Sequence, residues 1–314
     1  MIEPDSPIEV TLMKPNLIML VFLSILAAGC SDAIRLANYD LEDSPDDSAL
    51  AQGATAAAPE LLSAFFGLNS EAPLMANFFV CRGTRGRDAS PVVFPTELNL
   101  DTLQAGDFKV VRADGTAGTL HCVTPAPAFD IGELRTMLMV GDYGSTENPP
   151  VRVEIVGNLL SQDNRINYRG RSVAVVPLVD GPSMVLAEVI PADEWELGKK
   201  PTFMPFGGGS GCPEGTRQIV RVTWNGGITK PGGSEVDDLE RTSYAITMRD
   251  DDGKESTIVP YALGDLGDGD NNHKLCLDVD GSPVRITFPG GLVTDPREDL
   301  NPPTAIEVTT PHAG

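Results

Sequence analysis

The sequence predicts an all-β protein that folds as two β-sandwich domains. Short runs rich in Val, Ile, Thr and aromatic residues recur along most of the chain, and Gly, Asp and Pro separate them. No long stretch has the spacing of apolar residues that an amphipathic helix requires. A similar order of runs and turns occurs in both halves of the chain, which favours a tandem arrangement.

An export signal precedes these runs. Met13 is followed by a lysine, residues 17–28 are apolar, and small residues lead to Cys30, which is the order found in secretory signal peptides. The apolar run is too short to span a bilayer, which takes about 20 residues. Residues 1–29 are therefore expected to be a signal peptide. An acidic leader is atypical of such signals, so translation is expected to begin at Met13, after Glu3, Asp5 and Glu9.

The segment Leu26-Ala27-Ala28-Gly29-Cys30 resembles the lipobox of bacterial lipoproteins. The resemblance implies cleavage before Cys30, a diacylglyceryl group on its thiol and a further acyl chain, such as palmitate, on the new N-terminus. Several acyl chains on one residue make a durable membrane anchor. Ser31 stands where an Asp would favour retention in the inner membrane. The expected location is therefore the cell envelope, with a lipid anchor in the outer membrane, facing the periplasm, or at the cell surface.

Charge restricts the class of partner. The formal net charge is −22, and removal of residues 1–29 leaves about −20. Nucleic acids and anionic membrane surfaces bind to clustered Lys and Arg, so neither is an expected partner of the folded part. Acidity is compatible with divalent cations, but it is more typical of a soluble exported protein in general. A small molecule, a glycan and a protein all remain open as ligands.

Four cysteines follow Cys30, and an even number in an oxidising compartment predicts disulfides. They are Cys81, Cys122, Cys212 and Cys276. Three pairings are possible. We favour Cys81–Cys122 and Cys212–Cys276, because each pair then lies within one domain. No pair has the C-x-x-C spacing that is typical of zinc sites.

The part of the chain after Gly29 is expected to have four segments. Residues 30–60, with little apolar content, form a flexible tether. Residues 61–204 form the first sandwich, the Gly-rich residues 205–211 a linker, and residues 212–314 the second sandwich. Strands are expected at 77–81, 108–112, 118–123, 134–140, 152–156, 172–178 and 184–190, then at 218–224, 244–249, 256–261, 273–279 and 284–288. A helical turn is expected near residues 193–197.

The two halves have the features of an internal duplication. Residues 107–115 and 243–253 both read as a strand that ends at an Asp-Gly turn, and residues 134–140 and 150–153 match 271–277 and 283–286 in the same order. The alternative is coincidence between two β-rich halves. The arrangement is also similar to the Ig-like modules of bacterial surface proteins, over most of residues 70–310. That similarity implies Ig-like sandwiches and no particular function.

The Gly- and Asp-rich loop of residues 264–273 is the candidate metal site. Ca²⁺ takes six to eight oxygen ligands, and four side chains of the loop offer oxygens: Asp265, Asp268, Asp270 and Asn272. An EF-hand is excluded, because His273 stands in place of the required Gly and Val279 in place of the final Glu. A solvated turn with Asx hydrogen bonds is the alternative. Three further acids would join the site if the chain folds back: Asp295, Glu298 and Asp299.

Catalytic residues are scarce. Of the three histidines, His312 lies near the C-terminus and His121 lies in an expected strand, so His273 is the one candidate general base, with Asp270 beside it. Ser210 lies in a Gly-rich loop, but Cys212 breaks the G-x-S-x-G pattern of a nucleophile turn. A Gly-rich phosphate loop is excluded, because no Lys-Ser or Lys-Thr follows the glycines.

Two functions follow from these features. The favoured one is a cell-envelope lipoprotein whose tandem sandwiches act as a binding or structural module and bind Ca²⁺. The alternative is a Ca²⁺-dependent hydrolase of small esters or lactones, in which the cation polarises a carbonyl and His273 or a nearby Asp acts as base.

Overall fold

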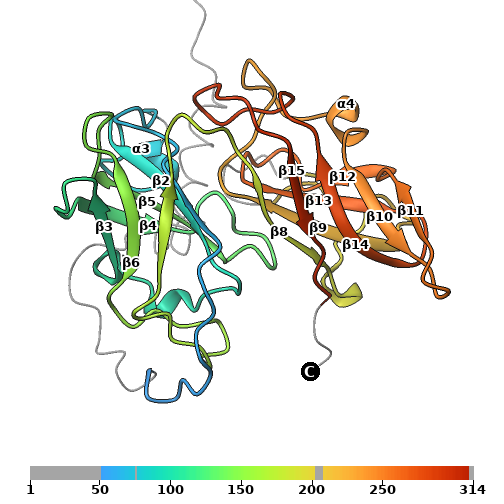
Figure 1. Cartoon of the computed structure of the whole chain (residues 1–314), viewed down its shortest axis with the longest axis horizontal. Helices are drawn as coiled ribbons and strands as arrows, with labels where there is room; N and C mark the ends of the chain where they lie inside the picture. Colours follow the sequence, from blue (N-terminus) through green and yellow to red (C-terminus); the bar gives the residue numbers. More distant parts are fainter. Residues whose placement is uncertain (1–50, 75, 202–207, 311–314) are drawn as a thin grey trace, which may run out of the picture. The chain divides into compact units, whose positions relative to one another are not determined.

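The computed structural model describes residues 51–74, 76–201 and 208–310, which belong to one compact unit (Figure 1). The signal peptide, the lipobox with Cys30, most of the tether, His312 and residues 205–207 of the expected linker lie outside the described residues. Within the described part, no helix is long and apolar enough to cross a membrane.

The first sandwich contains seven strands around one hydrophobic core. They are β1 (Ser63–Phe65), β2 (Asp88–Val93), β3 (Phe108–Arg112), β4 (Thr119–Thr124), β5 (Thr136–Asp142), β6 (Pro150–Ile155) and β7 (Ser172–Val176). The strand order is β3-β6-β7-β1-β2-β5-β4. The parallel pair β7 and β1 joins the part β3-β6-β7 to the part β1-β2-β5-β4. Buried side chains from both parts, such as Val110, Val153, Val92 and Met139, form the core.

The second sandwich contains eight strands in two sheets. They are β8 (Met184–Val189), β9 (Gln218–Trp224), β10 (Ala245–Arg249), β11 (Glu255–Ile258), β12 (Ala262–Gly264), β13 (Asn272–Leu277), β14 (Ser282–Phe288) and β15 (Thr304–Glu307). One sheet has the order β12-β13-β9-β8 and the other β11-β10-β14-β15. Their facing sides form a second core around Trp224, Tyr244 and Phe288.

The two sandwiches have matching topologies. The sheet β8-β9-β13-β12 repeats the order β1-β2-β5-β4, and β10-β14-β15 repeats β3-β6-β7. The register shift at Val151 of β6, opposite β3, recurs at Val284 of β14, opposite β10. The parallel β7–β1 pairing also has a counterpart, because Thr309 bridges Glu188 of β8 in parallel. The all-β prediction and the repeated strand order are therefore confirmed.

Several elements differ from the expected ones. Residues 77–81 were expected as a strand, but α3 (Ala76–Phe79) is a one-turn helix in which the Val80 amide donates to the Ala76 carbonyl. The apolar run there lacks alternation, so periodicity could not distinguish a strand from a helical turn. Within the described residues, the other short helices are η1 (Leu100–Thr102), η2 (Ala105–Asp107), η3 (Ala192–Glu194) and α4 (Asp238–Arg241). Strands β1, β2, β12 and β15 were not foreseen, since three are very short and β2 contains Pro91.

The boundary between the two sandwiches lies earlier in the chain than the expected boundary at residue 205. Leu178 packs in the first core, whereas Met184 and Ala187 pack in the second. Strand β8 pairs with β9 over its whole length. The described part of the Gly-rich segment, residues 208–211, consequently lies in the β8–β9 connection of the second sandwich.

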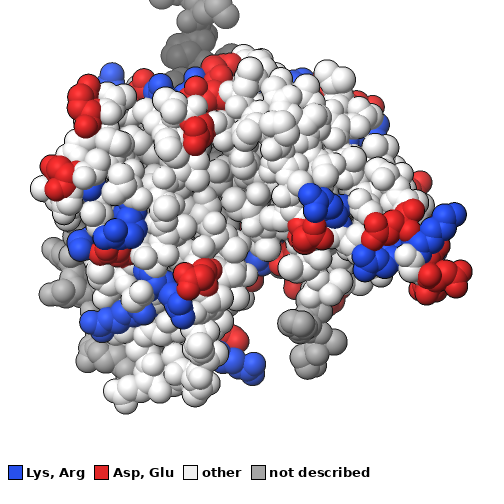
Figure 2. Space-filling model, viewed as in Figure 1, with Lys and Arg blue, Asp and Glu red and all other residues white. Residues whose placement is uncertain are grey.

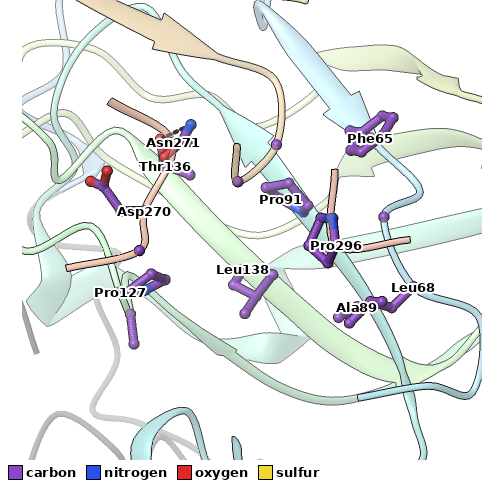
Figure 3. A pocket seen from close by; sticks show the side chains of 15 residues that line it. Phe65, Leu68, Ala89, Pro91, Pro127, Thr136, Leu138, Asp270, Asn271 and Pro296 are labelled. Carbon is purple, nitrogen blue, oxygen red and sulfur yellow. Dashed lines mark hydrogen bonds between the residues drawn. The ribbon is translucent and has the colours of Figure 1, made fainter. Parts of the chain in front are cut away.

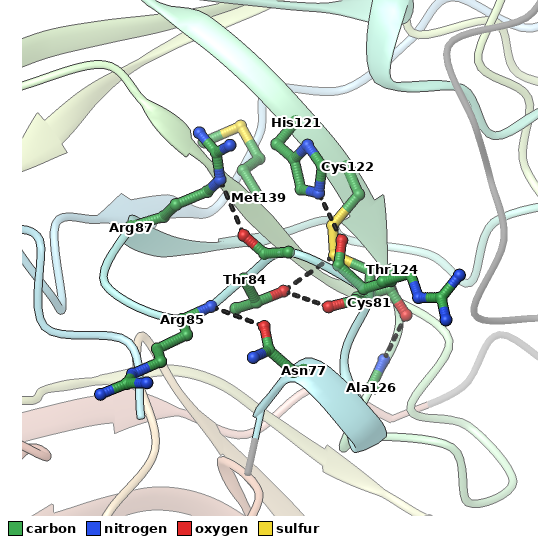
Figure 4. The surroundings of a disulfide bond; sticks show 12 residues. Asn77, Cys81, Thr84, Arg85, Arg87, His121, Cys122, Thr124, Ala126 and Met139 are labelled. Carbon is green, nitrogen blue, oxygen red and sulfur yellow. Dashed lines mark hydrogen bonds between the residues drawn. A yellow bond between two sulfur atoms is a disulfide. The ribbon is translucent and has the colours of Figure 1, made fainter. Parts of the chain in front are cut away.

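Both disulfides have the pairing that the sequence favoured, Cys81–Cys122 and Cys212–Cys276. Figure 4 shows the first, beside which His121 Nε2 bonds the carbonyl of Arg82 and Thr84 Oγ1 donates to the carbonyl of Cys81. His121 therefore has a structural role at the edge of β4.

The face of the molecule in Figure 2 has no single basic patch, because Lys and Arg lie next to acids. The β10–β11 hairpin at the right of that view pairs Arg249 with Glu255. At its tip, Asp250 accepts hydrogen bonds from the amides of Asp252 and Lys254. The acids at residues 250–252 thus belong to a turn held by Asx hydrogen bonds, as expected.

Candidate functional site

The site lies on the outer face of the sheet β12-β13-β9-β8. Register places Lys274 of β13 beside Arg221 of β9, and Arg221 beside Glu188 of β8. Paired residues point to the same side of a sheet, and this row points away from the second core. The β4–β5 connection of the first sandwich covers it: Arg221 donates to the carbonyls of Ile131 and Gly132. A charged row is therefore buried between the two sandwiches.

Five carboxyl groups gather at the Lys274 end of this row. Asp130 and Glu133 come from the β4–β5 connection, and Asp265, Asp268 and Asp270 come from the β12–β13 connection. We call these five residues the acidic cluster. Carboxylate oxygens of Asp130, Glu133 and Asp265 all lie within 4.8 Å of one another, and these three form a buried acidic triad that could bind a metal ion.

Two lysines offset part of the negative charge. Lys274 Nζ lies 2.8 Å from Asp265 Oδ1, 3.8 Å from Glu133 Oε1 and 4.0 Å from Asp130 Oδ2. Lys199 Nζ lies 3.2 Å from Asp130 Oδ2 and 2.8 Å from Glu196 Oε2. The five buried or half-buried acids of the cluster thus have two ammonium groups near them, and the one on Lys199 also pairs with a sixth acid, Glu196.

Burial and mutual repulsion disfavour ionisation of these acids. Burial, followed by the charges of Asp270 and Asp265, raises the pKa of Glu133 well above its usual range. Burial and Asp265 raise the pKa of Asp268 to about 6, and the pKa of Asp270 is raised for the same reasons. Burial alone would lower the pKa of Lys274, but the charges of Asp265 and Glu133 outweigh it and raise that pKa. Without a further cation, the acids of the cluster therefore favour bound protons over full ionisation.

Three buried carboxylate oxygens of the cluster accept no hydrogen bond from any described residue: Glu133 Oε1, Asp265 Oδ2 and Asp268 Oδ2. The Glu133 side chain is fully buried, and Asp265 is 2 % exposed. Carboxylate oxygens of Glu133 and Asp265 lie within 4.8 Å of each other, and a shared proton or a cation between them would reduce the repulsion that Lys274 leaves. Unpartnered buried oxygens of this kind are rare in folded proteins, and a bound ion is one of the partners that can satisfy them.

The Gly-rich loop closes over the same carboxylates. The amide of Gly208 donates to Asp130 Oδ1 at 2.8 Å. A Cβ on Gly209 would lie 2.6 Å from Asp268 Oδ2 and 3.0 Å from the Cα of Asp265, so a side chain at this position would displace the carboxylates. The loop of residues 208–211 therefore requires glycine where it meets the acidic cluster.

Ser210 connects this loop to the β12–β13 connection, and its hydroxyl meets no catalytic partner among the residues that the structure describes. Its carbonyl accepts from the Asp265 amide, and its Oγ accepts from the Leu266 amide at 3.3 Å. These bonds hold Asp265 in a left-handed backbone conformation, with a φ of 65°. The hydrogen bonds to Ser210 therefore fix the position of Asp265.

The structure divides the four candidate ligands into two pairs. Asp265 and Asp268 keep free oxygens. Asp270 Oδ1 and Oδ2 accept from the backbone amide and Nδ2 of Asn272, both at 2.8 Å, and Asn272 Oδ1 accepts from Thr223 Oγ1. Asp270 and Asn272 thus form the Asx turn that was the alternative interpretation of this loop.

His273 lies on the other face of β13 from Lys274. Its Nδ1 bonds Tyr244 Oη at 2.7 Å, and Tyr244 Oη accepts from Trp224 Nε1 at 3.1 Å. Burial lowers the pKa of His273 to about 4. The structure does not bring this imidazole together with the unpartnered carboxylates, so its geometry is that of a core residue.

The acids near the C-terminus form a turn of their own. Asp295 Oδ1 accepts from the amides of Arg297 and Asp299, and Glu298 accepts from the amide of Gly232. The chain does not add these carboxylates to the acidic cluster. Asp130 and Glu133, which do join it, lie in a connection of the other sandwich far upstream, and their i, i+3 spacing was the only signal of a shared position.

No family model and no curated protein matches this chain. Among solved structures, one similar chain is a tetra-tandem repeat in the extending region of a large adhesion protein, with 9 % identity and a TM-score of 0.19. The match covers 78 % of this chain and 47 % of that one, so this chain spans about half the length of the adhesion fragment. A likeness at this level defines neither a family nor a function.

Proposed function

We propose that the chain is a cell-envelope lipoprotein whose tandem sandwiches act as a non-catalytic binding or structural module, ordered by Ca²⁺ at the acidic cluster. The observation that carries the cation part is the set of unpartnered buried oxygens on Glu133, Asp265 and Asp268. The hydrolase alternative is not proposed, because His273 is turned into the second core and bonded to Tyr244.

The donor chemistry favours a hard cation. The free donors are carboxylate oxygens, and the described residues place neither a sulfur nor an imidazole among them. Oxygen-only sites suit Ca²⁺ and Mg²⁺, whereas zinc and copper prefer nitrogen and sulfur ligands. Ca²⁺ tolerates irregular geometry and mono- or bidentate carboxylates, whereas Mg²⁺ demands a near-ideal octahedron. Carboxylates contributed by two separate connections fit the more flexible ion.

A cation here would join the two sandwiches. Asp130 and Glu133 belong to the first sandwich, whereas Asp265 and Asp268 belong to the second. An ion between them would neutralise repulsion that otherwise pushes these two connections apart. A module that transmits force or presents a ligand from a membrane anchor benefits from such a fixed junction.

Calorimetry with matched variants tests the cation. The protein purified without chelator should contain Ca²⁺ by mass spectrometry, and its melting temperature should fall in EGTA. An ion at 100 times its Kd stabilises the folded state by about 2.7 kcal/mol. The Asp268→Asn variant should lose this response, whereas Asp250→Asn, at the exposed β10–β11 tip, should retain it. Equal melting temperatures in Ca²⁺ and EGTA, with no bound metal, would show that shared protons alone neutralise the cluster.

Acyl labelling tests the anchor. With the Cys30→Ser variant, palmitate incorporation and recovery in the membrane fraction should both disappear, whereas Cys81→Ser should still be labelled. Continued labelling of Cys30→Ser would contradict the lipoprotein assignment and leave the cation proposal intact.

A further inference from the structure

A partly open cavity of about 160 Å³ lies beside the acidic cluster and has walls from both sandwiches. The first sandwich contributes apolar side chains, among them Phe65, Pro91 and Leu138. The second contributes Pro296, Gly226, Gly227 and residues 269–271. Figure 3 shows Pro91, Leu138 and Pro296 gathered together, with Thr136, Asp270 and Asn271 at the other end.

The close packing of Gly226 helps to shape this cavity. A Cβ on Gly226 would lie 2.6 Å from Cδ1 of Phe65, so the absence of a side chain lets the Phe65 ring lie against the second sandwich. Gly227 is different, because a Cβ there would meet only the carbonyl oxygens of Asp270 and Gly269, at 3.7 and 3.9 Å. The space in front of Gly227 is therefore open.

The polar groups at the far end already have partners. Asn271 Nδ2 donates to Thr136 Oγ1 and to the carbonyl of Trp224. Both carboxyl oxygens of Asp270 are bonded by Asn272. An anionic ligand would lose its hydration here beside the Asp270 carboxyl group, and a cationic ligand would find both oxygens of that group already bonded by Asn272, so burial of either charge is costly. An uncharged apolar ligand loses little hydration and gains dispersion contacts.

We propose that this cavity is a binding site for a small neutral apolar molecule of about the size of one aromatic ring. A dry apolar cavity of about 150 Å³ is large enough to bind benzene. Because its walls come from both sandwiches, the bound molecule bridges them. The wall of residues 269–271 directly follows Asp268, so the ligand lies against the same connection as the acidic cluster. The proposal does not depend on a bound cation.

Saturation-transfer NMR on the folded protein tests the site, with toluene, indole, benzoate and benzylamine as probes. Toluene should bind, and the two charged analogues should bind at least tenfold more weakly. The Gly227→Val variant should weaken toluene binding at least tenfold by filling the cavity. The Gly106→Ala variant, at an open position in η2, is the control and should bind as the parent does.

A second variant changes the cavity in the opposite direction and covers the case in which Gly227→Val fails to fold. Leu138→Ala enlarges the space and should strengthen indole binding relative to toluene. The proposal is overturned if the parent binds no probe, if benzoate binds as tightly as toluene, or if folded Gly227→Val binds toluene like the parent.

Discussion

At the scale of single residues, β13 separates two kinds of buried polar chemistry. Lys274 faces the carboxylates of the first sandwich, and its neighbour His273 faces the aromatic core of its own sandwich. The two-residue period of a strand is enough to produce this division. The sequence suggested a joint role for His273 and the acidic loop because they are neighbours in the chain. Alternate side chains of a strand point to opposite faces, so the structure keeps the His273 imidazole away from the acidic cluster.

The buried imidazole makes stability depend on pH. Its pKa is about 4 in the folded protein against 6.5 ordinarily, so the unfolded chain binds the extra proton between these values. The contribution of neutral His273 to the free energy of unfolding is thus fully present above pH 6.5. It declines as pH falls towards 4, by up to about 3 kcal/mol. Urea unfolding of the parent and of His273→Asn should give free energies whose difference shrinks over this range. The partly exposed His121→Asn is the control, and a constant difference for His273→Asn would contradict the argument.

At the scale of secondary-structure elements, the sequence predicted the strands that are rich in β-branched and aromatic residues. It did not predict contacts between loops that lie far apart in the chain. The limits of β3 and β9 match the expected residues 108–112 and 218–224. Composition and turn residues are local properties, which single-sequence reasoning can use. The pairing of β8 with β9 depends on tertiary packing, and the Gly-rich segment misleadingly suggested a linker between them. Because tertiary contacts are not a local property, the sequence of residues 264–273 identified Asp265 and Asp268 as candidate ligands but did not identify their neighbours Asp130 and Glu133.

Strand β9 should be sensitive to loss of its buried cation. The Arg221 side chain is 2 % exposed and lies 2.9 Å from Glu188 Oε1. Arg135 Nη2 also lies 2.9 Å from Glu188 Oε1 and keeps that carboxylate paired. The cost of removing Arg221 is therefore the loss of its hydrogen bonds to the buried carbonyls of Ile131 and Gly132, about 1–3 kcal/mol. Arg221→Met should therefore lower the free energy of unfolding in urea by about that amount. Arg217→Met, at the exposed pair with Asp280, should change it by less than about 1 kcal/mol. Similar effects of the two substitutions would argue against a buried junction.

The two disulfides should differ in their effect on the acidic cluster. They close loops with sequence separations of 41 and 64 residues, and the chain-entropy model gives about 4 kcal/mol for each. The Cys212–Cys276 bond holds the end of the Gly-rich loop whose Gly208 bonds Asp130. Replacing this pair by serines should therefore reduce stability and the melting response to Ca²⁺. Replacing Cys81 and Cys122 should reduce stability alone. Loss of the Ca²⁺ response in both variants would remove the special role of the Cys212–Cys276 bond.

At the scale of the whole described molecule, two similar sandwiches each have a core of their own. Tandem repeats commonly unfold independently when few contacts connect them. Here the guanidinium of Arg221, the ammonium of Lys274 and the acidic cluster are buried where the sandwiches meet. If one sandwich unfolds while the other stays folded, the hydrogen bonds and ion pairs across the junction are lost. The junction should therefore couple the two unfolding reactions.

Scanning calorimetry should accordingly give one transition for the parent, with equal calorimetric and van't Hoff enthalpies. The junction can be opened at Gly132, where a Cβ would lie 2.0 Å from Nη1 of Arg221. Gly132→Ala should thus separate the β4–β5 connection from β9 and resolve two transitions.

Gly170 is the matched control for this experiment. Its φ of 89° is close to the 85° of Gly132, but its surroundings are open. Gly170→Ala therefore introduces the same backbone strain, about 1 kcal/mol, without the clash, and it should lower the melting temperature while keeping a single transition. Two transitions in the parent would show that the buried charges hold the sandwiches together too weakly to couple them. A single transition in Gly132→Ala would show that the coupling does not depend on the contact between Arg221 and the β4–β5 connection.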